Sequence, residues 1–330
     1  MRALDSLHPQ VHDGPPDYLA ADVELVVGDV RDSDAVQVAL DGVDVVVHLA
    51  ARVGVGQSMY EIAEYTSAND VGTAVLLEAL ADRRVRKLVV ASSMSIYGEG
   101  AYREGDPGER TREQLERREW EFPGFTPVPT PETKRPALSS IYALNKYQQE
   151  RACLVAGDAY GIPTVALRFF NAYGPRQALS NPYTGVLAIF ASRLLNGKPP
   201  RIFEDGAQTR DFVSVHDVAR ACALALERDG ADGRSVNVGS GRAITVRDLA
   251  AQLAATVGVD LEPELTGEFR LGDIRHCFAD VSLARKTLGY DPAVGLAEGM
   301  AELAGWLEGR TADDRVEEAA RELARRGLSG

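Results

Sequence analysis

Short runs of apolar, mostly β-branched residues alternate with helical patterns along much of this chain, and the alternation limits the folds open to it. Buried strands are expected at residues 23–27, 43–49, 87–91, 164–169 and 234–238. These runs are nearly continuous in Val, Leu and Ala, which is typical of strands covered on both faces. Strands separated by helices predict an α/β fold built on a parallel sheet.

Helical periodicity is expected at residues 34–40, 60–81, 139–157, 185–196, 245–257 and 313–326. The last of these patterns is amphipathic, because Val316, Ala319 and Leu323 share one face. Gly327 follows it as a plausible helix stop.

Composition excludes several classes of function. A formal net charge of −13 argues against a general nucleic-acid binder, which needs a basic surface, so any phosphorylated ligand has to be held by a few local arginines. Cys153, Cys222 and Cys277 form no CxxC pair, so neither a disulfide framework nor a metal site is expected. No apolar run approaches the ~18 residues of a membrane span, and the first ten residues lack the apolar core of a signal peptide. A cytoplasmic protein with no membrane partner is therefore expected.

Residues 103–135 stand apart from the rest, because they are first charged and then rich in proline. Two interpretations stay open: a solvated surface insertion, or a lid over a ligand site, since long ordered loops are often functional.

Tyr142 and Lys146 are the first candidates for chemistry. Residues four apart share a face of a helix, and a nearby ammonium lowers the pKa of a phenol, which is ~10 when unperturbed. Ser93 ends an expected parallel strand, where ligands of such sheets bind. Its hydroxyl could hydrogen-bond a substrate alcohol and share a proton with Tyr142. Chance spacing and an ordinary strand end are the competing explanations.

Further blocks follow in a characteristic order over nearly the whole chain. They are Gly28-Asp-Val-Arg-Asp32, His48-Leu-Ala-Ala51, Asn69-Asp-Val-Gly-Thr73, Ser92-Ser-Met-Ser-Ile-Tyr-Gly98, Tyr142-x-x-x-Lys146, Arg168-Phe-Phe-Asn171, Tyr173-Gly-Pro-Arg176, Asp205-Gly-x-Gln-x-Arg-Asp-Phe212, Asn237-Val-Gly-Ser-Gly241, Arg270-x-Gly-Asp273 and Ala279-Asp280. With these blocks the chain resembles the extended short-chain dehydrogenase/reductases, and among them the NAD-dependent nucleotide-sugar epimerases and dehydratases.

The resemblance implies an architecture: a Rossmann-like, doubly wound parallel sheet with a smaller mixed α/β substrate-binding domain. The NAD-binding domain would comprise residues 1–170 and 207–240, the nucleotide-sugar domain residues 171–206 and 241–310, and a C-terminal amphipathic helix residues 311–330. Family members commonly form homodimers through a four-helix bundle, here from residues 60–81 and 139–157. Val75, Leu76 and Leu80 could contribute to that interface or could face their own sheet.

The resemblance also implies roles for individual residues. Tyr142 would be the base, Lys146 its electrostatic partner and a ribose ligand, and Ser93 the proton-sharing hydroxyl. The cofactor, NAD, would be bound by Asp5, Asp29, Val30, Leu49, Ala50, Ala51, Asn69, Tyr142, Lys146 and Phe169. An acidic residue at Asp5 would repel the 2′-phosphate of NADP. The substrate, a nucleotide-diphosphate sugar, would be bound by Ser93, Asn171, Arg210, Arg270, Asp273 and Cys277.

One departure from the family pattern is large. Family members begin with a strand, a GxxGxxG loop and a helix, whereas the first residues here already match the end of the second strand. In the usual order 3-2-1-4-5-6 the first strand lies in the middle of the sheet. Without that first strand, we expect no strand to connect the family's second strand to its fourth. A misplaced start codon or an artificially shortened chain explains this better than a degenerate natural copy, because every downstream motif is intact.

The reaction is narrowed by Met94 and Ser95, which stand where the family's dehydratases carry an Asp-Glu pair. The remaining common activity is 4-epimerisation of a dTDP- or UDP-hexose through a 4-keto sugar, with dTDP-L-rhamnose as the narrower expectation. A nucleotide-sugar 4-ketoreductase or dehydratase remains an alternative. So does an inactive homologue that only binds nucleotide sugar.

Overall fold

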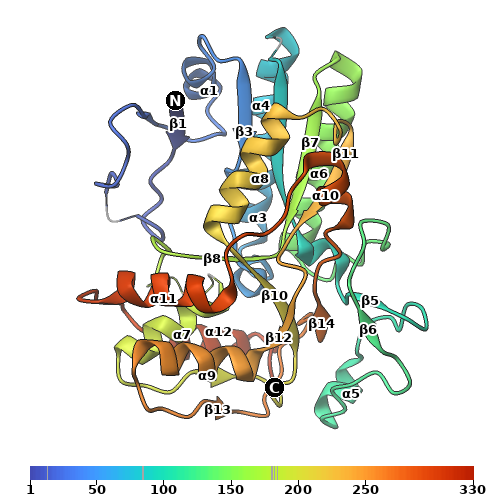
Figure 1. Ribbon diagram of the computed structural model, residues 1–330, viewed down its shortest axis with the longest axis vertical. Coiled ribbons are helices and arrows are strands. Elements are labelled where there is room, and N and C mark those ends of the chain that lie inside the picture. Colours follow the sequence, from blue (N-terminus) through green and yellow to red (C-terminus); the bar gives the residue numbers. More distant parts are fainter. Residues whose placement is uncertain (13, 84, 180, 182, 184) are drawn as a thin grey trace.

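The main sheet lies at the centre of the computed structural model, which describes residues 1–12, 14–83, 85–179, 181, 183 and 185–330 (Figure 1). Its four parallel strands are hydrogen-bonded in the order β11-β7-β4-β3. Their bounds are β3 Val45–His48, β4 Lys87–Ser93, β7 Thr164–Phe169 and β11 Arg234–Val238. The predicted parallel α/β architecture is confirmed.

Helices cover both faces of this sheet. One face carries α1 (Ser33–Ala39), α4 (Gly72–Asp82) and α6 (Ile141–Tyr160), and the other carries α8 (Val215–Glu227) and α10 (Ser282–Leu288). Neighbouring residues of a strand point to opposite faces. Leu88 and Val90 therefore pack in the apolar core under α1, α4 and α6, while Val89 packs in the core under α8 and α10. Both cores are therefore built from the same continuous apolar runs.

Two further parallel strands are separate from the main sheet. β1 (Arg2–Asp5) pairs with β2 (Glu24–Val27) to form a sheet of its own. Among the described residues no strand joins β1 to β3, which is the discontinuity expected for a sheet without its central first strand.

The long helix expected at residues 60–81 is interrupted. It comprises α2 (Val55–Ser58), α3 (Ile62–Thr66), a π-helical turn η1 (Ser67–Val71) and then α4. Leu76 and Leu80 of α4 are buried in the core against β4, so they face their own sheet. Of the two interpretations of these leucines, a dimer-interface role is wrong for this structure.

A second sheet forms beside the first. β10 (Thr209–Ser214) pairs with β8 (Asn171–Tyr173), β12 (Ala243–Thr245) and β14 (His276–Cys277). The predicted boundary placed residues 207–214 with the NAD-binding domain, whereas β10 is hydrogen-bonded to strands of this second sheet. Two short strands, β9 (Arg201–Ile202) and β13 (Glu264–Leu265), pair nearby.

Helices α7 (Val186–Leu195), α9 (Val246–Val257), α11 (Leu296–Leu307) and α12 (Val316–Arg325) gather at the lower end of the molecule in Figure 1. Ala319 and Leu323 form the buried face of α12, as its amphipathic pattern predicts. Gly327 follows with a φ of +69°, and the Leu328 amide donates to the Leu323 carbonyl. The helix stop predicted at Gly327 is confirmed. Within the described ranges no helix is both long and apolar enough to cross a membrane.

Residues 103–135 are ordered and anchored. They follow β5 (Ala101–Tyr102) and contain its partner strand β6 (Pro127–Val128) as well as α5 (Arg112–Glu116), which Thr111 and Gln114 cap reciprocally. Leu115 and Phe122 are buried. The segment is therefore a surface insertion that buried side chains anchor to the rest of the protein.

Candidate active site

Tyr142 lies in the first turn of α6, where Ser140 caps the helix by accepting from the Ala143 amide at 3.1 Å. Burial raises the pKa of Tyr142, while a hydrogen bond with Ser93 lowers it, and the net pKa is raised. Burial therefore disfavours the phenolate form of Tyr142, and the hydrogen bond with Ser93 favours it.

Lys146 follows one helical turn later and is almost fully buried. Its ammonium donates to the Gln149 side chain at 2.8 Å, and burial lowers its pKa to about 8. Gln149 in turn donates to Thr73 at 2.8 Å, and Thr73 contacts His48 at 2.9 Å. A buried polar network thus holds the lysine at the carboxyl end of β3.

Ser93 closes β4 at the same edge of the sheet. Its hydroxyl oxygen accepts from the backbone amide and the hydroxyl of Ser95, at 3.1 and 2.9 Å. Two acceptor positions are then filled, which leaves the Ser93 proton for Tyr142. The structure therefore brings Ser93 and Tyr142 together, with Lys146 one helical turn further along α6.

The residues expected to bind the cofactor lie along the strand ends, with different contacts. Asp5 accepts from the Leu7 amide at 2.7 Å, and Asp29 is paired with Arg31 at 2.6 Å. Val30 packs into the core beside α4. The carboxyl ends of β3 and β7 carry Leu49, Ala50, Ala51 and Phe169.

Asn69 is fully buried, and both of its polar side-chain atoms bond the backbone of Arg52. It holds the loop after β3, so its role in the structure is to shape the cofactor edge.

Asp273 joins the two arginines that were expected to bind the diphosphate. One of its oxygens accepts from Arg210 at 3.1 Å, and the other accepts from Arg270 at 2.7 Å. Burial alone would raise the pKa of Asp273, but the two guanidinium groups hold it well below its usual value. One carboxylate therefore links the two arginines, and Arg210 also donates to the backbone carbonyls of Ile274 and Arg275.

Asn171 supplies an acceptor that the protein leaves unused. Its side-chain oxygen is buried and has no hydrogen-bond partner among the described residues. An unpaired buried carbonyl is costly, so this atom is suited to a ligand donor.

Cys277 is fully buried in the core beside β4, with its sulfur 3.8 Å from the Thr130 hydroxyl. Burial raises its pKa to about 12. These surroundings are those of a structural thiol, which was the alternative to a role in lining the sugar pocket.

A buried ionic cluster lies between the insertion and the substrate-side sheet. Arg275 is fully buried and donates to Glu121, Glu204 and Asp205. Arg110 donates to Glu204 at 2.8 Å. Glu121 and Arg110 both come from residues 103–135, so the insertion is bound to the substrate side through paired charges.

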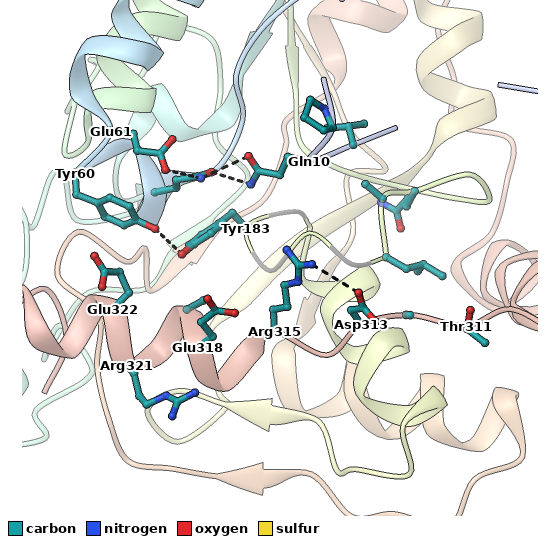
Figure 2. Close-up of a pocket in the computed structure, with 18 of the residues that line it drawn as sticks. Gln10, Tyr60, Glu61, Tyr183, Thr311, Asp313, Arg315, Glu318, Arg321 and Glu322 are labelled. Atoms are coloured by element: carbon teal, nitrogen blue, oxygen red, sulfur yellow. Dashed lines mark hydrogen bonds and ion pairs between the residues drawn. The ribbon is translucent and has the colours of Figure 1, made fainter. Parts of the chain in front are cut away.

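A cavity of about 1060 Å³ lies between α12 and the segment around Tyr60 and Tyr183 (Figure 2). Tyr60 and Tyr183 form one wall, with their hydroxyls 2.5 Å apart, and Glu318 and Glu322 of α12 form the opposite wall. Ser93, Tyr142 and Lys146 do not line it. We therefore locate the candidate active site by its side chains at the strand ends and not by this cavity.

Comparison with known proteins then identifies the family. The sequence model of the NAD dependent epimerase/dehydratase family matches residues 2–239. The chain belongs to this family. Among its relatives, the dTDP-L-rhamnose 4-epimerase of Burkholderia thailandensis is 38% identical over 92% of this chain and 87% of its own length. The UDP-glucose 4-epimerase of Mycolicibacterium smegmatis is 34% identical over 84% of this chain and 81% of its own.

Solved structures of the family agree with the fold. The Thermotoga maritima UDP-glucose 4-epimerase with UDP-glucose has a TM-score of 0.76 at 31% identity, covering 92% of this chain and 89% of that one. The Thermus thermophilus UDP-glucose 4-epimerase complex with NAD has a TM-score of 0.74 at 31% identity, covering 94% and 91%. The resemblance drawn from the motifs, and NAD as the family's cofactor, are confirmed.

The residues present fit the two ends of NAD better than its middle. Val27 ends β2 and Leu49 directly follows β3, with 62% and 56% of their surface exposed, so apolar side chains are open to a ligand at these strand ends. Tyr142 and Lys146 lie where the opposite end of NAD would be bound. The described residues include no glycine-rich strand–loop–helix for the pyrophosphate.

Some contributors were missed by the sequence analysis. Ser58 accepts from the Tyr142 backbone amide at 3.0 Å and was not among the predicted site residues. Gln149, the partner of Lys146, lies three residues further on the same helix, and that spacing was a usable signal. Ser95 had been considered only because it stands where the dehydratases carry an acidic residue.

Proposed function

We propose that this protein is a nucleotide-sugar 4-epimerase acting on a dTDP- or UDP-hexose, with dTDP-L-rhamnose as the narrower candidate. The observation that carries the proposal is the Ser93–Tyr142–Lys146 cluster with no acid following Ser93. Met94 and Ser95 occupy those positions, and the Ser95 hydroxyl is committed to Ser93. The family's dehydratases place their acid pair there, so elimination of water is not supported.

The proposed mechanism assigns each residue an atom. NAD, when bound, supplies reversible hydride chemistry at the sugar C4 carbon. Tyr142 takes the proton of the C4 hydroxyl and returns it after the 4-keto sugar has rotated in the site. Ser93 donates to Tyr142 or to the sugar hydroxyl, and the ammonium of Lys146 favours the phenolate. Arg210, Arg270 and the unpaired oxygen of Asn171 are proposed to hold the nucleotide end.

A turnover assay tests this proposal. A cofactor-loaded preparation should interconvert the 4-epimers of a dTDP- or UDP-hexose without added NADH, because a 4-epimerase regenerates its cofactor within each turnover. Consumption of added NADH in step with product would favour a 4-ketoreductase instead. Binding of nucleotide sugars with no interconversion of any of them would favour the inactive homologue.

We also propose a homodimer formed through α3–η1–α4 and α6. Four apolar side chains on these contacting helices are exposed, namely Ile62, Val71, Leu144 and Val155. They differ from Leu76 and Leu80, which are buried in their own subunit. A two-fold pairing of this surface would cover them. Light scattering at micromolar concentration that reports a monomer would contradict the dimer.

A cytoplasmic location is part of the same proposal. Cys153, Cys222 and Cys277 are all free thiols, which suits a reducing compartment. Fractionation of the host cell tests it.

A further inference from the structure

The diphosphate loop, residues 269–277, is held by two segments that lie far from it in sequence. It carries Arg270 and Asp273, and its last residues form β14. One segment is the insertion, residues 103–135. The other is the C-terminal strap, residues 316–330, which comprises α12 and the tail after it.

The tail of the strap pairs with the loop on both sides of Arg270. The Phe269 amide donates to the Gly330 carbonyl at 2.7 Å, and the Gly330 amide donates back at 3.1 Å. The Leu271 amide donates to the Leu328 carbonyl at 2.9 Å. Because the flanking residues are bonded in this way, the backbone that carries Arg270 has little freedom to move.

The insertion holds the same loop at Asp273. Arg110 donates one N–H to the Asp273 backbone carbonyl at 2.9 Å and another to Glu204 at 2.8 Å. Only 2% of its side chain is exposed, so this contact is screened from solvent. Since Asp273 bonds both Arg210 and Arg270, a restraint on Asp273 restrains both guanidinium groups.

The two segments are also joined to each other. Arg112, the first residue of α5, donates to the Gly327 carbonyl at 3.0 Å, where α12 gives way to the tail. Just ahead of the strap, Asp314 accepts from Lys198 at 2.9 Å and pairs with Arg193. Insertion, strap and loop thus form one connected structure.

We propose that the insertion and the C-terminal strap form a clamp that positions Arg210 and Arg270 for the diphosphate of a nucleoside-diphosphate ligand. The proposal rests on the proposed function and adds to it the positioning residues Arg110, Arg112 and the tail at 328–330. Rigid arginines lose less freedom when a ligand binds, so the clamp contributes to affinity for the diphosphate. It touches none of the catalytic side chains and leaves the chemical step unchanged.

Calorimetry with dTDP and with UDP tests the clamp without requiring turnover or NAD. Deletion of residues 328–330 removes the pairing around Arg270 and should raise the Kd by roughly tenfold. Arg110→Gln should have an effect of similar size, and Arg112→Ala, at an exposed contact, a smaller one. Arg117→Ala is the matched control, because Arg117 ends the same helix and pairs with the exposed Glu119 at 2.9 Å. Its Kd should not change.

Arg110→Gln leaves Glu204 and Glu99 with less counter-charge and could unfold the protein. In that event the tail deletion and Arg112→Ala, which disturb no buried charge, show whether the clamp contributes to nucleotide affinity. Unchanged or tighter binding in both overturns the clamp and leaves the proposed function standing. Failure of the unsubstituted chain to bind either nucleotide overturns the proposed function, and the clamp falls with it.

Discussion

The backbone amide of Tyr142 donates a 3.0 Å hydrogen bond to the side chain of Ser58, across 84 residues of sequence. The bond ties the start of α6 to the helix that follows β3. The position of the candidate base therefore depends on the cofactor-side loop as well as on its own helix.

Ser58→Ala should slow catalysis without abolishing it. The substitution leaves a partly buried amide unpaired, which costs about 1 kcal/mol of stability. A small displacement of Tyr142 should reduce kcat by roughly tenfold in a cofactor-loaded enzyme. Denaturant unfolding and steady-state kinetics measure the two effects. Unchanged kinetics together with the stability loss would show that the contact is structural only.

Tyr142→Phe should keep the fold and abolish epimerisation. The variant removes one hydroxyl, and loss of a general base typically costs ~10²–10⁴-fold in rate. Circular dichroism and nucleoside-diphosphate binding should match those of the unsubstituted protein. Near-normal turnover in the variant would sink the proposed mechanism.

Asp70→Asn should stabilise the protein at neutral pH. Burial raises the pKa of Asp70 to about 6, above its ordinary value of 3.8, while its hydrogen bond with Asn145 lowers it. A raised folded-state pKa means that ionisation costs stability; this cost is absent below about pH 4, grows between pH 4 and 6, and is constant above pH 6. One oxygen of Asp70 and one of Asn145 also lack partners among the described residues.

The gain in unfolding free energy from Asp70→Asn should be about 1–2 kcal/mol at pH 7 and should vanish near pH 4. Urea titrations at the two pH values give the comparison. A gain that is independent of pH would mean that packing, rather than ionisation, is responsible.

A protein consisting of residues 1–330 should bind NAD weakly. The described residues offer no helix N-terminus on a glycine-rich loop for the pyrophosphate. Calorimetry that finds tight NAD binding to these residues would refute this expectation. Adding a strand–GxxGxxG–helix segment ahead of Met1 should recover binding, because it would also supply the missing strand between β1 and β3.

Cys277→Tyr separates the two interpretations of that residue. Cys277 is buried against Thr130 and the backbone of Gly100, so a ring should overpack the core and cost about 1–3 kcal/mol. Activity should then fall equally across a panel of UDP- and dTDP-sugars. A selective loss for sugars with large substituents would return Cys277 to the sugar pocket, since selectivity appears in the ratio of kcat/KM values.

Local patterns were enough to predict much of this protein. The strands at Thr164–Phe169 and Arg234–Val238 have the expected bounds, because a continuous apolar run between turn signals encodes a buried strand locally. The convergence of Ser93 and Tyr142 was predictable as well. A crossover helix between two parallel strands begins at the edge of the sheet where the first strand ends, and Tyr142 lies in the first turn of α6, between β4 and β7.

Long-range pairing was decided only by the tertiary structure. The sequence determined that α12 is amphipathic and ends at Gly327, but not that its tail pairs with Phe269 and Leu271. It marked residues 103–135 as unusual, but not that Arg110 would be buried against Glu204. Periodicity records which face of an element is apolar. Which partner covers that face, or neutralises a buried charge, depends on the register of segments that meet only after folding.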